Sequence, residues 1–164
     1  MSELTIREAT PTDLEAIDDI YNHYVRTSTA TYQLEPDPFE VREAWFAAHA
    51  GRYPLIVAIE SSEVVGWASL SPFHPRAAYA GTVENSVYVR HDHHRRGIGA
   101  ALLTALIGRG RDAGFHTIVA LVDSAQTPSL ALHTRLGFTE VGRLSEAGRK
   151  FDRWLDVVYM QLML

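Results

Sequence analysis

Cysteine is absent from this chain of 164 residues. Its absence excludes disulfide bonds, zinc sites with thiolate ligands and a cysteine nucleophile, and it fits the reducing environment of the cytoplasm. Long apolar runs are absent too, since none approaches the ~20 residues that a membrane-spanning helix needs. The opening stretch, MSELTIREAT, carries charges and no apolar run, so it does not predict a secretory signal.

Positive charge is in short supply. The chain has 15 Lys and Arg residues against 20 Asp and Glu residues, which gives a formal net charge of −5. Nothing in this balance favours nucleic acid or an anionic membrane surface as a partner. Hydrophobic residues make up 46% of the chain, as in ordinary globular proteins. Because the sequence contains no repeat, low-complexity tract or linker, we expect residues 1–164 to form one domain.

Apolar periodicity and turn residues predict alternating strands and helices. The predicted strands cover residues 4–10, 54–60, 64–70, 81–89, 117–122, 138–144 and 152–164. The predicted helices follow Thr10 and Asp37-Pro38, run from Gly97 to about Ala113, and run from Thr127 to a stop at Gly137. The apolar face of the first helix would comprise Leu14, Ile17, Tyr21 and Tyr24, and that of the third Ile98, Leu102, Ala105 and Leu106. Hairpins and one β-α-β crossover together predict an α/β fold, with a mixed sheet and helices on its faces.

The segment HDHHRRGIG, residues 91–99, raises a choice between a metal site and a phosphate-binding loop. His91, His93 and His94 lie between a strand and a helix, where successive side chains point in different directions. The zinc pattern in which two histidines four residues apart share one helix face is missing. A solvated polar loop is a commoner explanation of such a run, and we expect no metal here.

The residues that follow the histidines fit phosphate better. Gly97 and Gly99 stand just before and inside the first turn of a predicted helix, whose free amides and dipole attract anions. Glycine lets another molecule approach the backbone closely, and Arg95 and Arg96 add phosphate donors. The segment lacks the lysine and the Ser/Thr of a nucleoside-triphosphatase loop.

The longer stretch VYVRHDHHRRGIGAALL, residues 87–103, resembles the acetyl-CoA-binding segment of the GNAT family of N-acetyltransferases. The family pattern Gln/Arg-x-x-Gly-x-Gly/Ala falls on residues 94–99, with His94 as a departure. Residues 22–36, 82–89, 128–138 and 147–162 resemble the phosphinothricin and methionine sulfoximine N-acetyltransferase branch. This resemblance covers nearly the whole chain. It implies a single GNAT domain with a mixed, mostly antiparallel and splayed sheet that carries helices on both faces.

The resemblance also implies acetyl-CoA as the co-substrate. Backbone groups of residues 87–89 would contact the pantetheine arm and the acetyl carbonyl, and the helix start would hold the pyrophosphate. Gln126 stands where the family commonly has an asparagine that contacts the cofactor. The implied cofactor-binding residues are Val87, Tyr88, Val89, Arg95, Arg96, Gly97, Ile98, Gly99, Ala100 and Gln126.

Glu84 lies in the otherwise apolar strand TVENSVYV. A carboxylate there is costly to bury unless it is paired or functional, although it could face water on a one-sided strand. In the resembled branch, the matching glutamate is the general base, which takes the amine proton directly or through water. Partial burial would raise its pKa toward the working pH, as such a base needs.

His133 lies in the helix PSLALHTRLGF and is either structural or functional. Many GNAT enzymes carry a tyrosine at this position that protonates the thiolate of CoA, whereas the resembled branch has histidine. The resemblance therefore implies that His133 donates a proton to the thiolate or belongs to a proton network beside the substrate.

The loop FHPRAAYAG, residues 73–81, matches branch residues that line the acceptor site. Arg76 suits an α-carboxylate or a phosphinate, which a guanidinium grips with two hydrogen bonds, although an exposed hairpin loop is the alternative. Residues 27–29 resemble a mobile wall of the acceptor pocket, and Trp154 is expected in the core or at a dimer contact. The implied substrate-binding residues are His74, Pro75, Arg76, Tyr79, Glu84, Asn85 and Ser86.

The function implied is transfer of an acetyl group to the α-amine of phosphinothricin, methionine sulfoximine or methionine sulfone. One alternative is an acetyltransferase for a protein or peptide N-terminus or for a polyamine, which would require an acidic pocket and disagrees with Arg76. Another is a non-catalytic acyl-CoA-binding module, which disagrees with Glu84. We expect a cytoplasmic homodimer with a small-molecule acceptor and no nucleic-acid or membrane partner.

Overall fold

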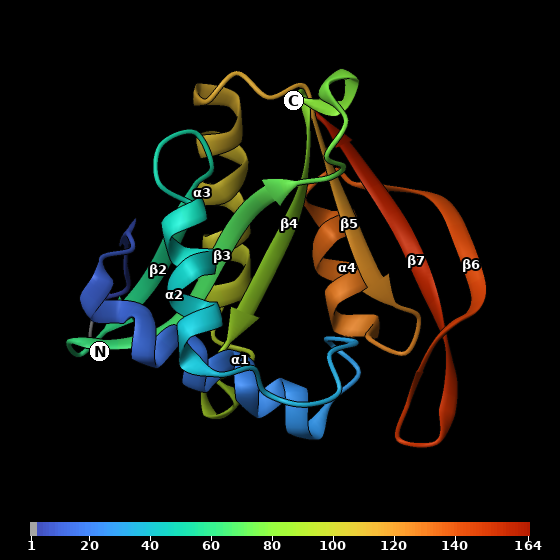
Figure 1. Cartoon of the computed structure of the whole chain (residues 1–164). Coiled ribbons are helices and arrows are strands. Elements are labelled where there is room, and N and C mark those ends of the chain that lie inside the picture. The colour runs from blue at the N-terminus through green and yellow to red at the C-terminus, as the bar shows by residue number, and fades with distance from the viewer. Residues whose placement is uncertain (1–2) are drawn as a thin grey trace.

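The computed structural model describes residues 3–164, which form seven strands of one sheet and four α-helices (Figure 1). The strands are β1 (Thr5–Glu8), β2 (Leu55–Glu60), β3 (Glu63–Pro72), β4 (Thr82–Val89), β5 (Thr117–Asp123), β6 (Thr139–Lys150) and β7 (Arg153–Met163). The helices are α1 (Leu14–Thr27), α2 (Phe39–Ala48), α3 (Ile98–Asp112) and α4 (Thr127–Arg135). The predicted order of elements and the α/β class are confirmed.

Three predicted strands differ in length from the observed ones by three residues or more, and one of them, β3, extends beyond its prediction at both ends. β1 is shorter than the predicted strand, and β6 extends well beyond residue 144. Most of β6 is exposed, and as an edge strand it bonds only β7. Its sequence, TEVGRLSEAGRK, therefore has no buried face to produce the apolar alternation that reveals a strand.

The sheet has the order β1-β2-β3-β4-β5-β7-β6, and every neighbouring pair is antiparallel except β4 and β5. β4 and β5 pair only from Thr82–Glu84 to Thr117–Val119. Beyond Glu84, β4 stays bonded to β3 as far as Val89, while β5 stays bonded to β7 as far as Asp123. The two strands therefore separate, and the splayed, mostly antiparallel sheet is confirmed.

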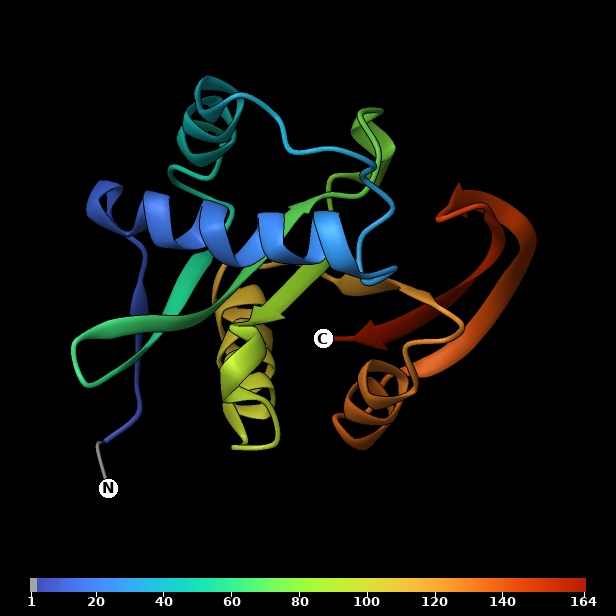
Figure 2. The same cartoon turned by 90° about the horizontal axis from the view of Figure 1, so that it is seen from below.

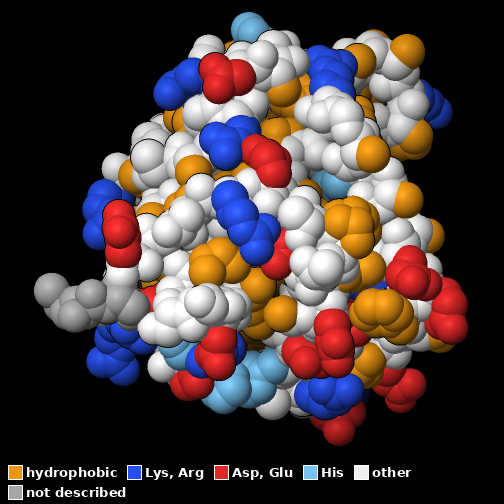
Figure 3. Space-filling model, turned by 90° about the vertical axis from the view of Figure 1, so that its left-hand side faces the viewer, with side chains coloured by type: hydrophobic (Ala, Val, Ile, Leu, Met, Phe, Trp, Pro, Cys, Tyr) orange, Lys and Arg blue, Asp and Glu red, His pale blue; other side chains and the backbone are white. Residues whose placement is uncertain are grey.

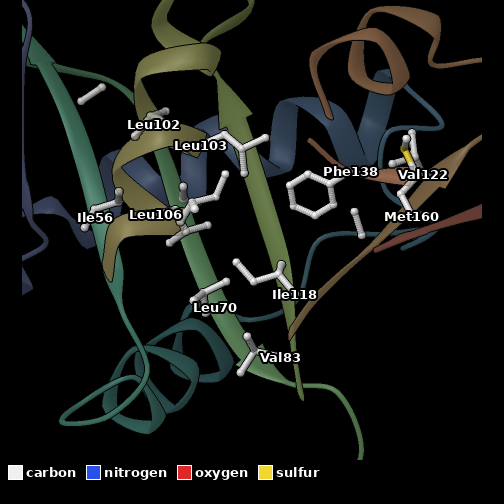
Figure 4. Packing of buried hydrophobic residues seen from close by; sticks show 14 of the residues in the cluster. Ile56, Leu70, Val83, Leu102, Leu103, Leu106, Ile118, Val122, Phe138 and Met160 are labelled. Carbon is white, nitrogen blue, oxygen red and sulfur yellow. The ribbon is translucent and has the colours of Figure 1, made fainter. Parts of the chain in front are cut away.

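Helices cover both faces of the sheet, with α1 and α2 on one side and α3 and α4 on the other (Figure 2). Each side has its own apolar cluster. Ile17 and Ile20 of α1 pack with Trp67 on the first side. On the second, Leu102 and Leu106 point from α3 toward the sheet, as Figure 4 shows, among buried residues of five strands and Phe138. The predicted apolar face of α3 is thus buried, apart from the half-buried Ala105.

The carboxyl-terminal hairpin of β6 and β7 exposes several large apolar side chains. Trp154 is 57% exposed. Of the two locations expected for it, the core and a dimer contact, this exposure excludes the core. Val141, Leu144 and Phe151 of the same hairpin are exposed as well. Within residues 3–164, no helix has the length and apolarity needed to cross a membrane.

Gly66 fixes how closely α3 lies against β3. A Cβ at this position would stand 3.0 Å from the side chain of Leu102 and 3.0 Å from the carbonyl oxygen of Tyr88, which the sheet holds in place. We therefore predict that Gly66→Ala lowers the free energy of unfolding by about 1–3 kcal/mol, measured by urea denaturation. Gly108→Ala in α3 is the matched control. Its Cβ would meet nothing within 4 Å, so it should raise stability by ~0.5–1 kcal/mol. Equal stability of the two variants would contradict this packing.

Candidate active site

A cavity of about 1250 Å³ opens where β4 and β5 separate. Its walls come from β4 (residues 84–89), the end of β5 (residues 120–123), the start of α3 (residues 97–100) and α4. Residues 29–33, which follow α1, and side chains of α1 and α2 complete the wall. Since strand side chains alternate between faces, the cavity has an α1 side, which Glu84, Ser86 and Tyr88 face, and an α3 side, which Asn85, Val87 and Val89 face.

The amino terminus of α3 forms one end of the α3 side. Gly97 caps this helix with a φ of 78°, a left-handed conformation that favours glycine. The first helical hydrogen bond runs from the Ala101 amide to the Gly97 carbonyl, so the amides of Ile98, Gly99 and Ala100 have no partner inside the helix. A Cβ on Gly99 would make only ordinary contacts, the nearest at 3.4 Å, so internal packing does not demand glycine there. The geometry provides an anion site that another molecule can approach closely.

The two predicted arginines lie in different places. Arg95 lines the cavity, whereas Arg96 is not part of its wall and donates to Glu60 at 2.9 Å. All the other predicted cofactor-binding residues line the cavity.

Histidines cluster beside this helix, and Figure 3 shows histidine side chains gathered at one edge of the molecule. The rings of His23 and His91 stack with centroids 4.0 Å apart, and His94 Nε2 lies 2.6 Å from the Tyr24 hydroxyl. In the described part of the chain, no group of three His, Cys, Asp or Glu side chains is placed to hold a metal ion. His23, His91 and His94 thus pack against aromatic rings, whereas the His93 ring contacts Asp92. The free amides of α3 remain as the site for an anion.

Glu84 is half-buried on the α1 side, and burial raises the pKa of its carboxyl above the ordinary value. Ser71 is its cross-strand neighbour on the same face. His49 Nδ1 lies 2.7 Å from the Trp45 carbonyl, so Nδ1 carries the proton and Nε2 is an acceptor. The Ser71 hydroxyl, 3.0 Å from that Nε2, therefore donates to His49 and not to Glu84. Glu84 lacks this stabilising donor and keeps its basicity.

His133 is buried and bridges α4 to β4. Its Nδ1 lies 2.7 Å from the Ser129 carbonyl and must carry the proton, which leaves Nε2 to accept from Asn85 Nδ2 at 2.9 Å. Burial lowers the pKa of the imidazole, against the smaller opposing effect of the Ser129 carbonyl. A neutral His133 whose proton is already donated holds Asn85 in place, directly after the last residue of β4 that pairs with β5.

Asp123, at the end of β5, fixes residues 29–33. Its buried carboxylate accepts the hydroxyls of Thr29 at 2.7 Å and Tyr32 at 2.8 Å. Gln126 Nε2 donates to the Thr29 hydroxyl at 3.1 Å, so this predicted cofactor residue also supports the wall. Thr29, expected in a mobile wall of the acceptor pocket, is therefore bound to β5.

Aromatic rings wall the α1 side. Tyr21 of α1 and Tyr88 have ring centroids 5.3 Å apart, Tyr88 and Trp67 of β3 have theirs 5.0 Å apart, and Trp67 and Trp45 of α2 follow at 5.4 Å. The guanidinium of Arg42 lies among these rings. This side can enclose a small molecule next to Glu84.

Four predicted acceptor-binding residues are not brought to the cavity. His74, Pro75, Arg76 and Tyr79 lie in the exposed loop between β3 and β4 and are not part of the cavity wall. Their placement matches the exposed-loop alternative. Thr27 and Ser28 also lie outside the wall, unlike Thr29.

The sequence profile of the acetyltransferase (GNAT) family matches residues 17–138, more than half of the chain. The chain belongs to the acetyltransferase (GNAT) family. As a GNAT enzyme it is an acyltransferase with acetyl-CoA as its co-substrate, so the predicted family, enzyme class and co-substrate are confirmed.

Individual GNAT relatives match this enzyme over nearly its full length. The L-methionine sulfoximine/L-methionine sulfone acetyltransferase of Pseudomonas paraeruginosa is 44% identical over 98% of this chain and 94% of that protein. The phosphinothricin N-acetyltransferase of Streptomyces viridochromogenes is 40% identical over 95% and 85%. The crystal structure of a phosphinothricin acetyltransferase from Sinorhizobium meliloti in complex with AcCoA is 37% identical, with a TM-score of 0.95 over 100% of this chain and 89% of that one.

Sequence reasoning missed several residues of this GNAT site, because they gather only in the folded chain. Arg42, Trp45, Trp67 and Asp123 line the cavity from three separate elements, α2, β3 and β5. Tyr21 was expected on the apolar face of its helix, and it is there, at the edge that meets the cavity. The sequence feature that could have indicated this part of the site is Arg42, three residues before Trp45 on a helix that has no fully buried residue.

The free amides of α3 predict how acetyl-CoA binding responds to substitution. Gly99→Asp places a carboxylate where phosphate would sit, so acetyl-CoA affinity measured by calorimetry should fall by at least tenfold in the folded variant. Gly99→Ala is the control, because its Cβ has room, and it should bind more tightly than Gly99→Asp. Unchanged affinity in folded Gly99→Asp would place the pyrophosphate elsewhere.

The raised pKa of Glu84 also predicts a gain in stability on its removal. Above that pKa the folded protein carries a carboxylate that burial disfavours, and below the unfolded value, ~4.3, the carboxyl is neutral in both states. Glu84→Gln should therefore raise Tm by a few degrees at neutral pH, and the gain should vanish in acid. Calorimetry across pH tests this, with Glu43→Gln on the exposed surface of α2 as control. A gain of equal size at every pH would contradict burial as the cause.

Proposed function

We propose that this enzyme acetylates the α-amine of a small amino-acid analogue, with L-methionine sulfone, L-methionine sulfoximine and phosphinothricin as candidate acceptors. The observation that carries the proposal is the position of Glu84, a half-buried carboxylate that faces an aromatic wall in the same cavity as the free amides of α3. The names of the relatives at 44% and 40% identity support this class of acceptor. The aromatic wall of the α1 side favours a small molecule over a protein or peptide N-terminus.

The proposed chemistry assigns each step to residues of this chain. Glu84 takes a proton from the acceptor ammonium, so that the amine nitrogen can attack the thioester carbonyl. One N–C bond forms, one C–S bond breaks, and the CoA thiolate leaves and gains a proton. The backbone of residues 85–89, unpaired on the β5 side, supplies groups for the pantetheine arm, and the amides of residues 98–100 hold the pyrophosphate.

His133 enters the proposal as a positioning residue. A neutral imidazole whose Nδ1–H bonds Ser129 and whose Nε2 accepts from Asn85 is a poor acid for the thiolate. Its geometry supports the network role implied by the resemblance. Ser86 belongs to the acceptor side with Glu84.

The remaining parts of the proposal rest on the resemblance. His74, Pro75, Arg76 and Tyr79 stay as proposed acceptor residues, although their loop lies outside the cavity of the single chain. We propose that residues 1–164 form one N-acetyltransferase domain. We also propose a cytoplasmic location, because a chain without cysteine forms no disulfide bond and needs no oxidising compartment. A homodimer would give the exposed Trp154 a contact.

The direct test is a free-CoA release assay across a panel of acceptors. The panel holds the three amino-acid analogues, a polyamine and a peptide with a free N-terminus. The proposal expects turnover with at least one analogue and a higher kcat/KM for it than for the polyamine or the peptide. A preference for either of these, or CoA release with none, would refute it.

Glu84 should set the acidic limb of the pH–rate profile, at a pH above the ordinary pKa of a glutamate, because only the carboxylate can accept the ammonium proton. Glu84→Gln keeps the shape and removes the basicity, so kcat should fall by about 10²–10⁴-fold, while acetyl-CoA affinity barely changes. The remaining rate should climb with pH as free amine accumulates in solution. His133→Phe should slow the enzyme less. A near-normal rate of Glu84→Gln at neutral pH would move the base to another group.

A further inference from the structure

Arg42 reaches from α2 into the α1 side of the cavity, and its side chain is only 11% exposed. Its Nε donates to Asp18 Oδ1 at 3.0 Å, and Asn22 Nδ2 donates to the other oxygen of Asp18 at 2.9 Å. This arrangement holds one edge of the guanidinium from α1. The bond to Asp18 also offsets the cost of keeping a cation largely out of water.

The flat faces of the same guanidinium are covered by aromatic rings. Its central carbon lies 4.6 Å from the ring centroid of Tyr21 and 4.7 Å from that of Trp45. Contact with two rings restricts the orientation of the planar group, and the electron-rich ring faces attract its positive charge. The edge that carries Nη1 and Nη2 has no hydrogen-bond partner among residues 3–164, and it is therefore the edge left to donate to a molecule in the cavity.

A second buried donor lies in the same wall. Trp67 is 2% exposed and lines the cavity, and its Nε1 has no partner among the described residues. Its ring packs edge-on against Trp45, one of the rings that hold Arg42. The Trp67 ring therefore supports Trp45 from the sheet, and through Trp45 it helps to fix the guanidinium of Arg42.

Arg42 and Glu84 are also suited to the two ends of one acceptor. Glu84 faces the α1 side, and Tyr88 lies two pleats further along the same face of β4, against Tyr21. An α-amino acid carries an ammonium and a carboxylate on one carbon, so it meets a carboxylate and a guanidinium in one pocket with both charges paired. The side chains of the candidate acceptors differ, but this amine and this carboxylate are common to all of them.

We propose that Arg42 is the residue that selects acceptors with a free α-carboxylate, through the Nη edge that Asp18, Tyr21 and Trp45 leave open. The proposal rests on the proposed function. It assigns recognition of the α-carboxylate to α2, and leaves Arg76, in the exposed loop between β3 and β4, to other contacts with the acceptor.

The test compares kcat/KM for methionine sulfone with kcat/KM for its carboxamide, which keeps the amine and the sulfone and removes the negative charge. The wild-type enzyme should prefer the carboxylate by about ten- to a hundredfold, the usual effect of one charge-assisted interaction. In Arg42→Gln this ratio should fall close to one, mainly through KM. Arg42→Lys should keep part of the preference, since it retains the charge without the fork.

Three further variants separate recognition from structural support. Asp18→Asn removes the ion pair between α1 and α2 but leaves the guanidinium, so it should keep most of the carboxylate preference. Arg52→Gln removes a guanidinium that stacks on Phe115 away from the cavity, at 4.3 Å, and should leave the ratio unchanged. Arg76→Gln tests the alternative in which the loop between β3 and β4 recognises the carboxylate. Acetyl-CoA affinity measured by calorimetry verifies that each variant is folded.

The outcomes separate this proposal from the proposed function. Failure of the wild-type enzyme to acetylate any of the three candidate analogues refutes the proposed function, and if methionine sulfone alone is inert the comparison uses the analogue that is turned over and its carboxamide. Turnover with a ratio that survives in Arg42→Gln overturns the role of Arg42, and so does a ratio lost equally in Asp18→Asn, which would make Arg42 a clamp between helices. Loss of the ratio in Arg76→Gln alone would return the anion site to the loop.

Discussion

The separation of β4 from β5 is the constraint on which the rest of the structure depends. Beyond Glu84, β4 stays paired with β3 and β5 stays paired with β7, so each strand diverges together with its other neighbour. The opening leaves backbone groups of residues 85–89 without a strand partner, and such groups are costly to bury unless something pairs with them. A cleft with an unsatisfied strand edge is therefore built in by the topology, before any particular side chain is considered.

Side chains then keep the cleft from closing and give its two sides different chemistry. The Asn85–His133 bond holds β4 against α4 at the point of separation, and Asp123 binds residues 29–33 to the end of β5. On the α3 side the groups that face the cavity are amides at a positive helix end. On the α1 side they include aromatic rings, the carboxylate of Glu84 and the guanidinium of Arg42. An anion such as pyrophosphate suits the first side, and a small zwitterion suits the second.

The sequence predicts those features of the site that residues of one contiguous segment form, and it does not predict those that residues far apart in the chain form. The α3 end was predictable because a strand, two glycines and a helix start are contiguous, and Gly97 and Gly99 act through local geometry. Glu84 was predictable as an anomaly within an apolar strand. The α1 side was not, since its residues come from three separate elements, α1, α2 and β3, and each alone fits an ordinary amphipathic pattern. These residues are Tyr21, Arg42, Trp45 and Trp67. Arg76 shows the converse, because the resemblance marked its loop, whereas the fold of the single chain leaves that loop at the surface. β6 was underestimated because an exposed edge strand needs no apolar alternation.

The central claim is that the strand edge opened by this separation is where acetyl-CoA binds, and hydrogen exchange measured by mass spectrometry tests it most directly. In the free enzyme, the amides of residues 85–89 that do not bond β3 should exchange faster than those of the fully paired β3. Acetyl-CoA should slow exchange in peptides that cover residues 85–89 and 97–100, and leave the β6–β7 hairpin unchanged. Protection confined to other segments, or none within residues 85–89, would contradict the account.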